Sequence, residues 1–240
     1  MLQLFLDLLS QPCRSVYIFA KKNQIDFEFK EVKLFRGEHH SEEFKSVNPL
    51  KKVPALKDGD FTLAESIAIL LHLARKYNTP DHWYPSDLEK RAKVDEYLSW
   101  QHTAVRANGS KVFWCKVMTP LLLGQEIAPE RLEAVMKEMN TTLQQFEETF
   151  LQDKPFIVGE EISLADLVAI VELMQPVGAG VDVFKDHPKL EAWRDRVEAA
   201  LGSELFLEAH KNVLTCLEVK MEALDPKVVE VLKAKLLLFK

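Results

Sequence analysis

The sequence is poor in cysteine and has no excess of positive charge. Three of its 240 residues are cysteines (Cys13, Cys115 and Cys216), an odd and sparse set that excludes a disulfide-rich scaffold and fits a reducing compartment, most simply the cytosol. The formal net charge is -6. Nucleic acids and anionic membranes attract proteins with large positive fields, so we expect neither as a partner.

Long apolar runs and metal-ligand spacings are also missing. No stretch approaches the roughly 20 apolar residues that span a bilayer. The apolar segment 1–9 has no basic residue and contains Asp7, so it predicts a buried strand better than a signal peptide. None of the seven His residues has zinc-ligand spacing with a cysteine, and we predict no metal site. The expected location is the cytoplasm.

The segment 1–78 mixes strand and helix patterns. Alternating leucines predict a first strand over 2–8, and Ser10 followed by Pro12 predicts the start of a helix. A second strand near 27–32 and a short helix from Ser41 follow. Asp58-Gly59 between two apolar segments predicts a hairpin, and the apolar spacing over 65–76 predicts an amphipathic helix. The predicted order is βαβ, helix, ββα.

The segment 79–87 contains two prolines and predicts a linker, after which every pattern over 88–240 is helical. One long helix should run through Val94 and Val105, with an interruption at Asn108-Gly109. A second should cover 132–150.

Two further helices are predicted nearer the C-terminus. Ser163 and Asp166 form a capping-box pattern before the apolar run 164–174, which predicts a central buried helix. A last helix should start at Asp225-Pro226 and end near Phe239. The fold class is therefore an α+β domain with a mixed sheet, followed by an all-α domain.

Ser10-Gln11-Pro12-Cys13 stands where the first strand meets the first helix. Two-cysteine redox enzymes carry C-x-x-C at this point, but here the first position is serine and the other cysteines are remote. A hydroxyl at a helix N-terminus can instead favour a bound thiolate, because the free N–H groups and the helix dipole attract negative charge. Taken alone, this motif is explained more simply by helix capping.

Three other motifs fit a small peptide ligand, although each has an ordinary explanation. If Pro54 is cis, the backbone of Val53 can pair with an extended peptide; an ordinary turn proline is the alternative. Glu65-Ser66 begins a helix and suits the ammonium and carboxylate of an amino acid; capping is the alternative. A second carboxylate of such a ligand could bind to a group of four basic residues: His39, His40, Lys51 and Lys52. A charged face exposed to solvent is the alternative explanation.

These segments together resemble a cytosolic glutathione transferase of the theta class. The matching stretches are residues 10–14, 48–56 and 65–69, and residues 163–167 resemble the buried capped helix of that family. The resemblance covers nearly the whole chain and weakens after about residue 215. It implies a homodimer whose subunits have a thioredoxin-like domain (1–78), a linker (79–87) and a helical domain (88–240). It also implies no tightly bound cofactor, with glutathione as co-substrate.

The resemblance also implies roles for individual residues. Ser10 would hydrogen-bond the glutathione sulfur, in a class that uses serine where several others use tyrosine. The matching glutathione positions are His39, Lys52, Val53, Glu65 and Ser66, with Thr103 and Arg106 in a segment that approaches glutathione in the dimer. Some relatives carry an acidic residue in place of Thr103. Candidates for an apolar electrophile site between the domains are Val105, Trp114 and Met118, which helix packing explains equally well.

The expected reaction is attack by the glutathione thiolate on a small electrophile. By resemblance, substrates are alkyl halides, epoxides, sulfate esters and organic hydroperoxides, the last through a peroxidase activity. A free thiol has a pKa of about 8.5, which a helix terminus and charged neighbours can lower. Two alternatives remain from the residues alone: a non-catalytic binding module of the same fold, and a thiol oxidoreductase that uses Cys13.

Overall fold

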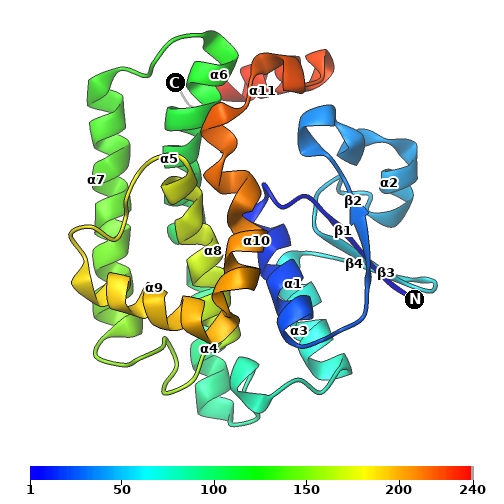
Figure 1. The fold of residues 1–240 in the computed structure, drawn as a ribbon, viewed down its shortest axis with the longest axis vertical. Coiled ribbons are helices and arrows are strands. Elements are labelled where there is room, and N and C mark those ends of the chain that lie inside the picture. The colour runs from blue at the N-terminus through cyan, green and yellow to red at the C-terminus, as the bar shows by residue number, and fades with distance from the viewer. Residues whose placement is uncertain (239–240) are drawn as a thin grey trace.

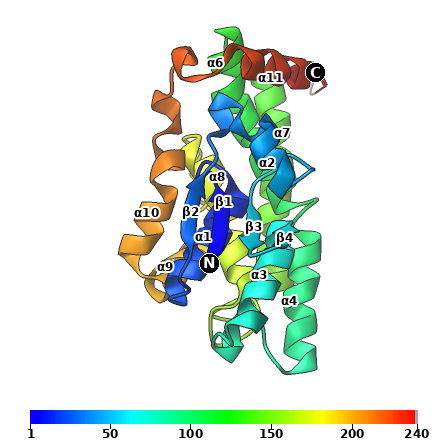
Figure 2. The same cartoon turned by 90° about the vertical axis from the view of Figure 1, so that its right-hand side faces the viewer.

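The structure is a computed structural model that describes residues 1–238. Its N-terminal part is an α+β domain with a four-stranded sheet in the order β2-β1-β3-β4 (Figures 1 and 2). β1 pairs in parallel with β2 and antiparallel with β3, and β3 forms a hairpin with β4. The elements are β1 (Leu2–Leu6), α1 (Gln11–Lys22), β2 (Glu28–Glu31), α2 (Glu42–Val47), β3 (Ala55–Asp58), β4 (Phe61–Ala64) and α3 (Ser66–Lys76). The predicted element order and mixed sheet are confirmed.

The remainder is helical, as the patterns predicted. The segment 79–87 contains a short 3₁₀ turn, Asp81–Trp83, whose Trp83 is buried against Phe19 with ring centroids 5.4 Å apart. The connector is thus packed onto the first domain. The helices are α4 (Leu88–Trp100), α5 (Val105–Phe113), α6 (Thr119–Leu123), α7 (Pro129–Gln145), α8 (Leu164–Gly178), α9 (Pro188–Leu201), α10 (Ser203–Leu214) and α11 (Pro226–Leu238).

The predicted interruption at Asn108-Gly109 is wrong. The break lies at residues 101–104, between α4 and α5, and Asn108-Gly109 are inside α5. Asn108 stays helical while its amide donates to the Thr142 hydroxyl (2.8 Å). Gly109 is accommodated because it faces α8, where an added Cβ would lie 3.5 Å from the Glu172 carbonyl oxygen. A glycine costs a helix about 1 kcal/mol relative to alanine, which tertiary packing outweighs here.

The predicted helix over 132–150 is continuous, but it changes from an α-helix to a π-helix near its end. α7 runs into a π-helical segment, Phe146–Leu151, and α5 likewise runs into Trp114–Met118. Such wider turns are rare and often lie at functional sites. The last helix is described to Leu238; Phe239, where we expected it to end, lies outside the described residues.

α8 is the central helix, and almost all of its residues are buried. The predicted capping box is present: Asp166 accepts hydrogen bonds from the backbone N–H and the hydroxyl of Ser163, both at 2.9 Å. The same carboxylate accepts from the Ile157 N–H and the Trp193 indole, again at 2.9 Å. α1 packs on α8 and α10, so the first domain is anchored to this central helix (Figure 1).

Candidate active site

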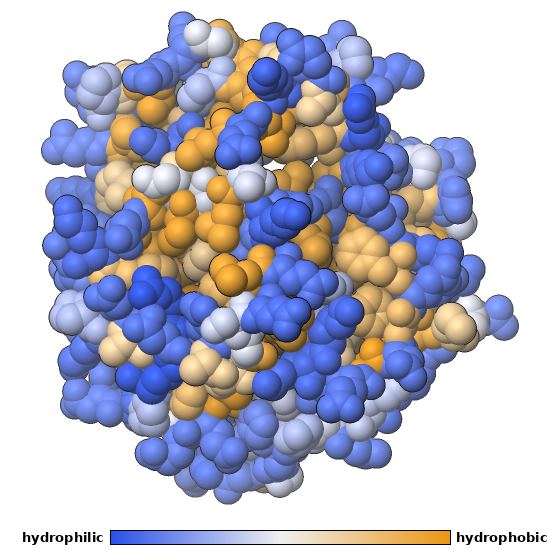
Figure 3. Space-filling model, viewed as in Figure 1, coloured by the Kyte–Doolittle hydropathy of each residue, from blue (hydrophilic) through white to orange (hydrophobic). Residues whose placement is uncertain are grey.

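A cleft of about 630 Å³ opens between the two domains, beneath α11. Figure 3 shows a hollow in the surface there, with apolar side chains gathered around it. Loops of the first domain, the end of α5, the π-helical turn and α11 all contribute to its walls. The lining residues are Leu9, Ser10, Gln11, Leu34, Phe35, His39, His40, Leu50, Lys51, Lys52, Val53, Ser110, Phe113, Trp114, Met118, Gln175, Val228, Val231 and Leu232.

Ser10 occupies the N-cap position of α1, but its side chain makes no capping hydrogen bond. Its backbone is extended (φ -83°, ψ 125°), and its carbonyl accepts the first helical bond from Arg14 (3.1 Å). Ser41 shows the contrast, because its hydroxyl caps α2 by accepting from Phe44 N–H (3.1 Å). The simpler interpretation of Ser10 as a helix cap therefore fails. Ser10 is half-buried and lines the cleft at a helix N-terminus, where negative charge is favoured.

Cys13 is fully buried and does not line the cleft. Burial raises the pKa of its thiol to about 12, against smaller opposing contributions that include the Ser10 hydroxyl. Such a thiol is protonated at neutral pH and is a poor nucleophile. All three cysteines are free and buried. The geometry therefore does not support the oxidoreductase alternative.

The Val53-Pro54 peptide is cis, and Val53 lines the cleft together with Lys52. The loop before it is held by Asn48, whose amide donates to the Lys52 carbonyl (2.7 Å) and whose side-chain oxygen accepts from Leu50 N–H (3.0 Å). His39 also lines the cleft. A cationic group and a peptide edge thus lie in the same cleft as the Ser10 hydroxyl.

The remaining predicted glutathione residues do not line this cleft. Glu65 precedes α3 with a left-handed backbone (φ 68°) that is costly for a non-glycine residue, and its side chain is exposed. Ser66 is buried at the first position of α3. Burial lowers the pKa of His102, Arg106 lowers it further, and Glu65 raises it. The charges of Glu65 and Arg106 therefore act on the same side chain.

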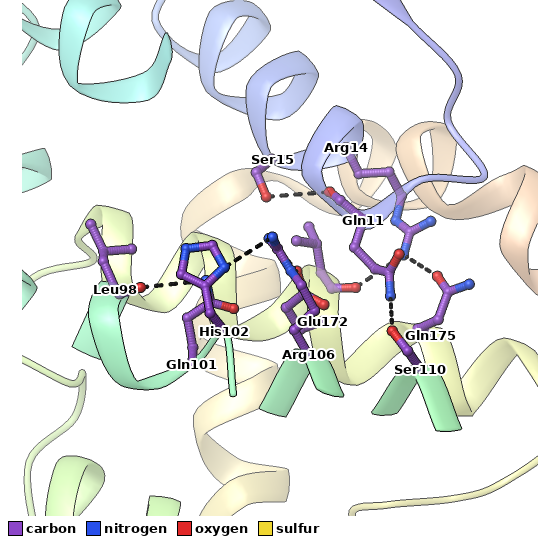
Figure 4. Close-up of polar contacts among 11 residues, drawn as sticks. Gln11, Arg14, Ser15, Leu98, Gln101, His102, Arg106, Ser110, Glu172 and Gln175 are labelled. Carbon is purple, nitrogen blue, oxygen red and sulfur yellow. Dashed lines mark hydrogen bonds and ion pairs between the residues drawn. The ribbon is translucent and has the colours of Figure 1, made fainter. Parts of the chain in front are cut away.

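The segment 103–106 is divided by the break between α4 and α5. Thr103 is exposed, and its hydroxyl contacts the Trp100 carbonyl (3.4 Å). Arg106 donates through Nε to the buried carboxylate of Glu172 at 2.8 Å, as Figure 4 shows. Val105 is 1% exposed and packs in the main core, so the structure does not place it in the electrophile wall. Trp114 and Met118, by contrast, line the cleft.

Several cleft residues escaped sequence reasoning. Leu34 and Phe35 come from a short 3₁₀ turn, and Gln175 comes from the buried helix α8. Val228, Val231 and Leu232 come from α11, whose place over the cleft no local pattern revealed. The loop 34–37 is bonded to the residue just before α11, because the Asp225 N–H donates to the Phe35 carbonyl (2.8 Å).

Comparison with known proteins decides what this cleft belongs to. Residues 9–75 match the family model "Glutathione S-transferase, N-terminal domain", and residues 111–200 match "Glutathione S-transferase, C-terminal domain". The chain is 57% identical to glutathione S-transferase theta-1 of Gallus gallus over 248 residues, covering 95% of each chain. It is 62% identical to the theta-1 enzyme of Homo sapiens over 213 residues, covering 89% of each chain.

The chain belongs to the glutathione S-transferase family. Its fold matches the apo form of human glutathione S-transferase T1-1 with a TM-score of 0.94 at 57% identity, covering 99% of this chain and 98% of that one. It also matches a human theta-class glutathione transferase in complex with the glutathione conjugate of 1-menaphthyl sulfate, with a TM-score of 0.91 at 48% identity over 97% of each chain. The predicted thioredoxin-like and all-helical architecture is confirmed.

This theta-class glutathione transferase is thus an enzyme with glutathione as co-substrate. Within residues 1–238, no helix combines the length and the apolar character needed to cross a bilayer. The same residues contain no cluster of three His, Cys, Asp or Glu side chains fit to hold a metal ion.

Proposed function

We propose that the cleft binds glutathione with its sulfur at Ser10 and transfers the thiolate to a small apolar electrophile. The observation that carries this proposal is the position of Ser10, a residue that lines the cleft at the N-terminus of α1 and whose side chain makes no capping hydrogen bond. The hydroxyl donates to the sulfur and, with the helix end, stabilises the anion. In the reaction the thiol proton leaves to solvent. With a halide or sulfate ester a C–S bond forms and the leaving group departs with its electron pair; with an epoxide the ring C–O bond breaks and its oxygen takes a proton. With a hydroperoxide the sulfur attacks the terminal oxygen, the O–O bond breaks to release the alcohol, and a second glutathione reduces the resulting sulfenic acid to give the disulfide and water.

The other parts of glutathione are assigned to residues of the same cleft and next to it. The cis peptide at Val53-Pro54 offers an edge for the glutathione backbone, and Lys52 with His39 faces its glycine carboxylate. The γ-glutamyl end extends toward Glu65 and Ser66 at the start of α3. Thr103 and Arg106 would approach glutathione in a homodimer, which we also propose together with a cytoplasmic location.

The electrophile binds in the apolar half of the cleft. Trp114 and Met118 form one wall, and α11 forms another through Val228, Val231 and Leu232. This wall fits alkyl halides, epoxides, sulfate esters and the organic hydroperoxides of a peroxidase reaction. One solved theta-class relative was crystallised with the glutathione conjugate of a sulfate ester, 1-menaphthyl sulfate.

The decisive experiment compares Ser10→Ala with Ser15→Ala on a panel of these electrophiles. Ser15 lies on the same helix but outside the cleft, where its hydroxyl contacts the Gln11 carbonyl (3.3 Å). Loss of a hydrogen bond to a charged group predicts that kcat falls by about 10- to 100-fold in Ser10→Ala, with glutathione affinity changed by less than about threefold. Ser15→Ala should behave like wild type. Equal activity of Ser10→Ala and wild type on every substrate would refute the mechanism. Glutathione affinity without turnover in wild type would favour the binding-module alternative.

A further inference from the structure

Arg14, four residues after Ser10, has no exposed surface (0%). Burial lowers its pKa to about 10, while Glu172 opposes this change, so the guanidinium is protonated at neutral pH. A buried cation is weak evidence for stability, because desolvation offsets its interactions. Its Nε has no hydrogen-bond partner in the described part of the chain. A contribution to the stability of the fold therefore does not explain why a cation is buried at this position.

The guanidinium joins the peptides before Ser10 to the central helix. Nη1 donates to the carbonyls of Leu8 and Leu9, both at 3.0 Å. Nη2 donates to the Val171 carbonyl (3.0 Å) and to the side-chain oxygen of Gln175 (2.8 Å), both on α8 (Figure 4). One side chain thus ties the end of the β1–α1 loop to α8.

Leu9, the residue directly before Ser10, is held on both of its peptide groups. Its carbonyl accepts from Arg14, and its N–H donates to the buried carboxylate of Asp7 at 2.9 Å. The other oxygen of Asp7 accepts from Leu34 N–H (2.8 Å), at the start of a 3₁₀ turn that also contributes to the cleft. The place of Ser10 in the cleft therefore depends on two buried charged groups.

The buried charges around Arg14 belong to several elements. On α8, Glu172 is fully buried one turn before Gln175, and it also pairs with Arg106 of α5 at 2.8 Å. α8 thus carries one carboxylate between two guanidinium groups (Figure 4). The titratable groups that interact electrostatically with Arg14 are Asp7 at the end of β1, Cys13 on α1, Glu172 on α8, His210 on α10 and Cys216 after α10.

We propose that Arg14 is a positioning residue for conjugation, which holds the peptide of Leu9 so that Ser10 faces the sulfur and whose buried charge stabilises the glutathione thiolate. The inference rests on the proposed function of Ser10. Cys13 supplies a local comparison: although burial dominates the raised pKa of that thiol, the charge of Arg14 lowers it. A sulfur bound at Ser10 would lie near the same cation, in a partly desolvated cleft where charges interact more strongly than in water.

Two isosteric changes on α8 test the charge with opposite expected signs. Glu172→Gln removes the negative charge that offsets Arg14, so the pKa of the bound glutathione thiol should fall. Gln175→Glu places a negative charge beside Arg14, so that pKa should rise; Gln175→Met is its uncharged control and should change it little. Each shift should be on the order of half a unit to one unit, as for one charge at an effective dielectric constant near 20. The thiolate absorbance of the enzyme–glutathione complex, titrated with pH, measures it.

A third variant separates positioning from charge. Arg14→Lys keeps the cation but cannot reproduce the fork that bonds Leu8, Leu9 and α8 together. Its kcat should fall by about 10-fold, while the pKa of the bound thiol moves by less than about half a unit and glutathione affinity is retained. Wild-type kcat in Arg14→Lys would overturn the positioning role, and a general loss of folding would appear as lost glutathione affinity instead.

The controls distinguish this inference from the proposed function beneath it. If Ser10→Ala leaves the bound thiol pKa unchanged, the proposed role of Ser10 fails, whatever the other variants do. If Ser10→Ala raises that pKa but Glu172→Gln and Gln175→Glu move it in the same direction or not at all, the role of Ser10 stands and the electrostatic role of Arg14 is wrong. Opposite shifts in the two α8 variants support the inference if both shrink in an Arg14→Gln background. Gln175 itself lines the cleft, so a charge there also acts directly on the thiolate, and shifts that persist without the Arg14 charge would overturn its electrostatic role.

Discussion

The hydroxyl of Ser10 lines the cleft, whereas the thiol of Cys13, three residues later on the first turn of α1, is fully buried in the core. The two groups stand at the first and last positions of a motif that two-cysteine enzymes use for disulfide exchange. Here the residue that lines the cleft carries an oxygen, and the sulfur is enclosed in the core. The sulfur that reacts must therefore come from the bound substrate, which agrees with glutathione transfer.

Cys13→Ala should retain at least about half of the wild-type kcat with glutathione and an alkyl halide. Burial raises the pKa of this thiol to about 12, so almost no thiolate is present at neutral pH. Steady-state kinetics on the purified variant provide the measurement. Removal of a buried sulfur also creates a small cavity and should lower thermal stability. Loss of turnover in a folded variant would restore the redox alternative.

Leu232→Ala on α11 should weaken the binding of apolar electrophiles. Leu232 lines the cleft, and its truncation removes apolar contact area and widens the wall. We expect kcat/KM for an apolar electrophile to fall by about 10-fold, while the affinity for glutathione stays within about twofold. Lys233→Ala, the next residue and exposed, is the matched control. An equal loss in both variants would mean that α11 acts through its own stability and not through contact with the electrophile.

Gly178→Ala should destabilise the fold by about 1–3 kcal/mol through overpacking. At this position a Cβ would overlap the carbonyl oxygen of Val213 and lie 2.6 Å from its Cγ2, so α8 and α10 would have to separate. Urea unfolding gives the free energy of unfolding. Gly159→Ala is the control, because nothing lies within 4 Å of its added Cβ. If the two variants had equal free energies of unfolding, α8 and α10 could accommodate the extra methyl group without loss of stability, and the prediction would be wrong.

His210 should make the protein less stable as the pH falls. Burial, together with a smaller contribution from the charge of Arg14, lowers its pKa from 6.5 to about 3, so below pH 6.5 the unfolded chain binds a proton that the folded chain does not. The stabilising contribution is complete above pH 6.5 and is lost progressively toward about pH 3. His210→Leu should remove about 2 kcal/mol of the loss measured between about pH 7 and about pH 5. The free energy of unfolding, measured by urea at both pH values, tests this. If wild type and variant lost the same amount of stability on going to the lower pH, the burial of a neutral imidazole would be contradicted.

Local patterns predicted most of the secondary structure, because they record which side chains face the core. The alternating leucines of β1 and the capping box of Ser163 and Asp166 are confirmed by the structure. The predicted break at Asn108-Gly109 is wrong because it relied on local propensity alone. Local propensity favours a break there, but the fit of Gly109 against α8 keeps the helix intact.

The sequence by itself determined the α+β and helical domains, their order, and the family to which the chain belongs, because periodicity, turn residues and short motifs are local properties. Only the tertiary structure decided which of the candidate residues share a cleft: Ser10, Lys52 and Trp114 meet there, while Val105 is buried in the core. It also revealed Arg14 as a buried cation between the Leu8–Leu9 peptides and α8. Burial and charge at such a position depend on packing between residues more than 150 apart in the chain, as the bond between Arg14 and Gln175 (161 residues) shows, and no local pattern encodes that distance.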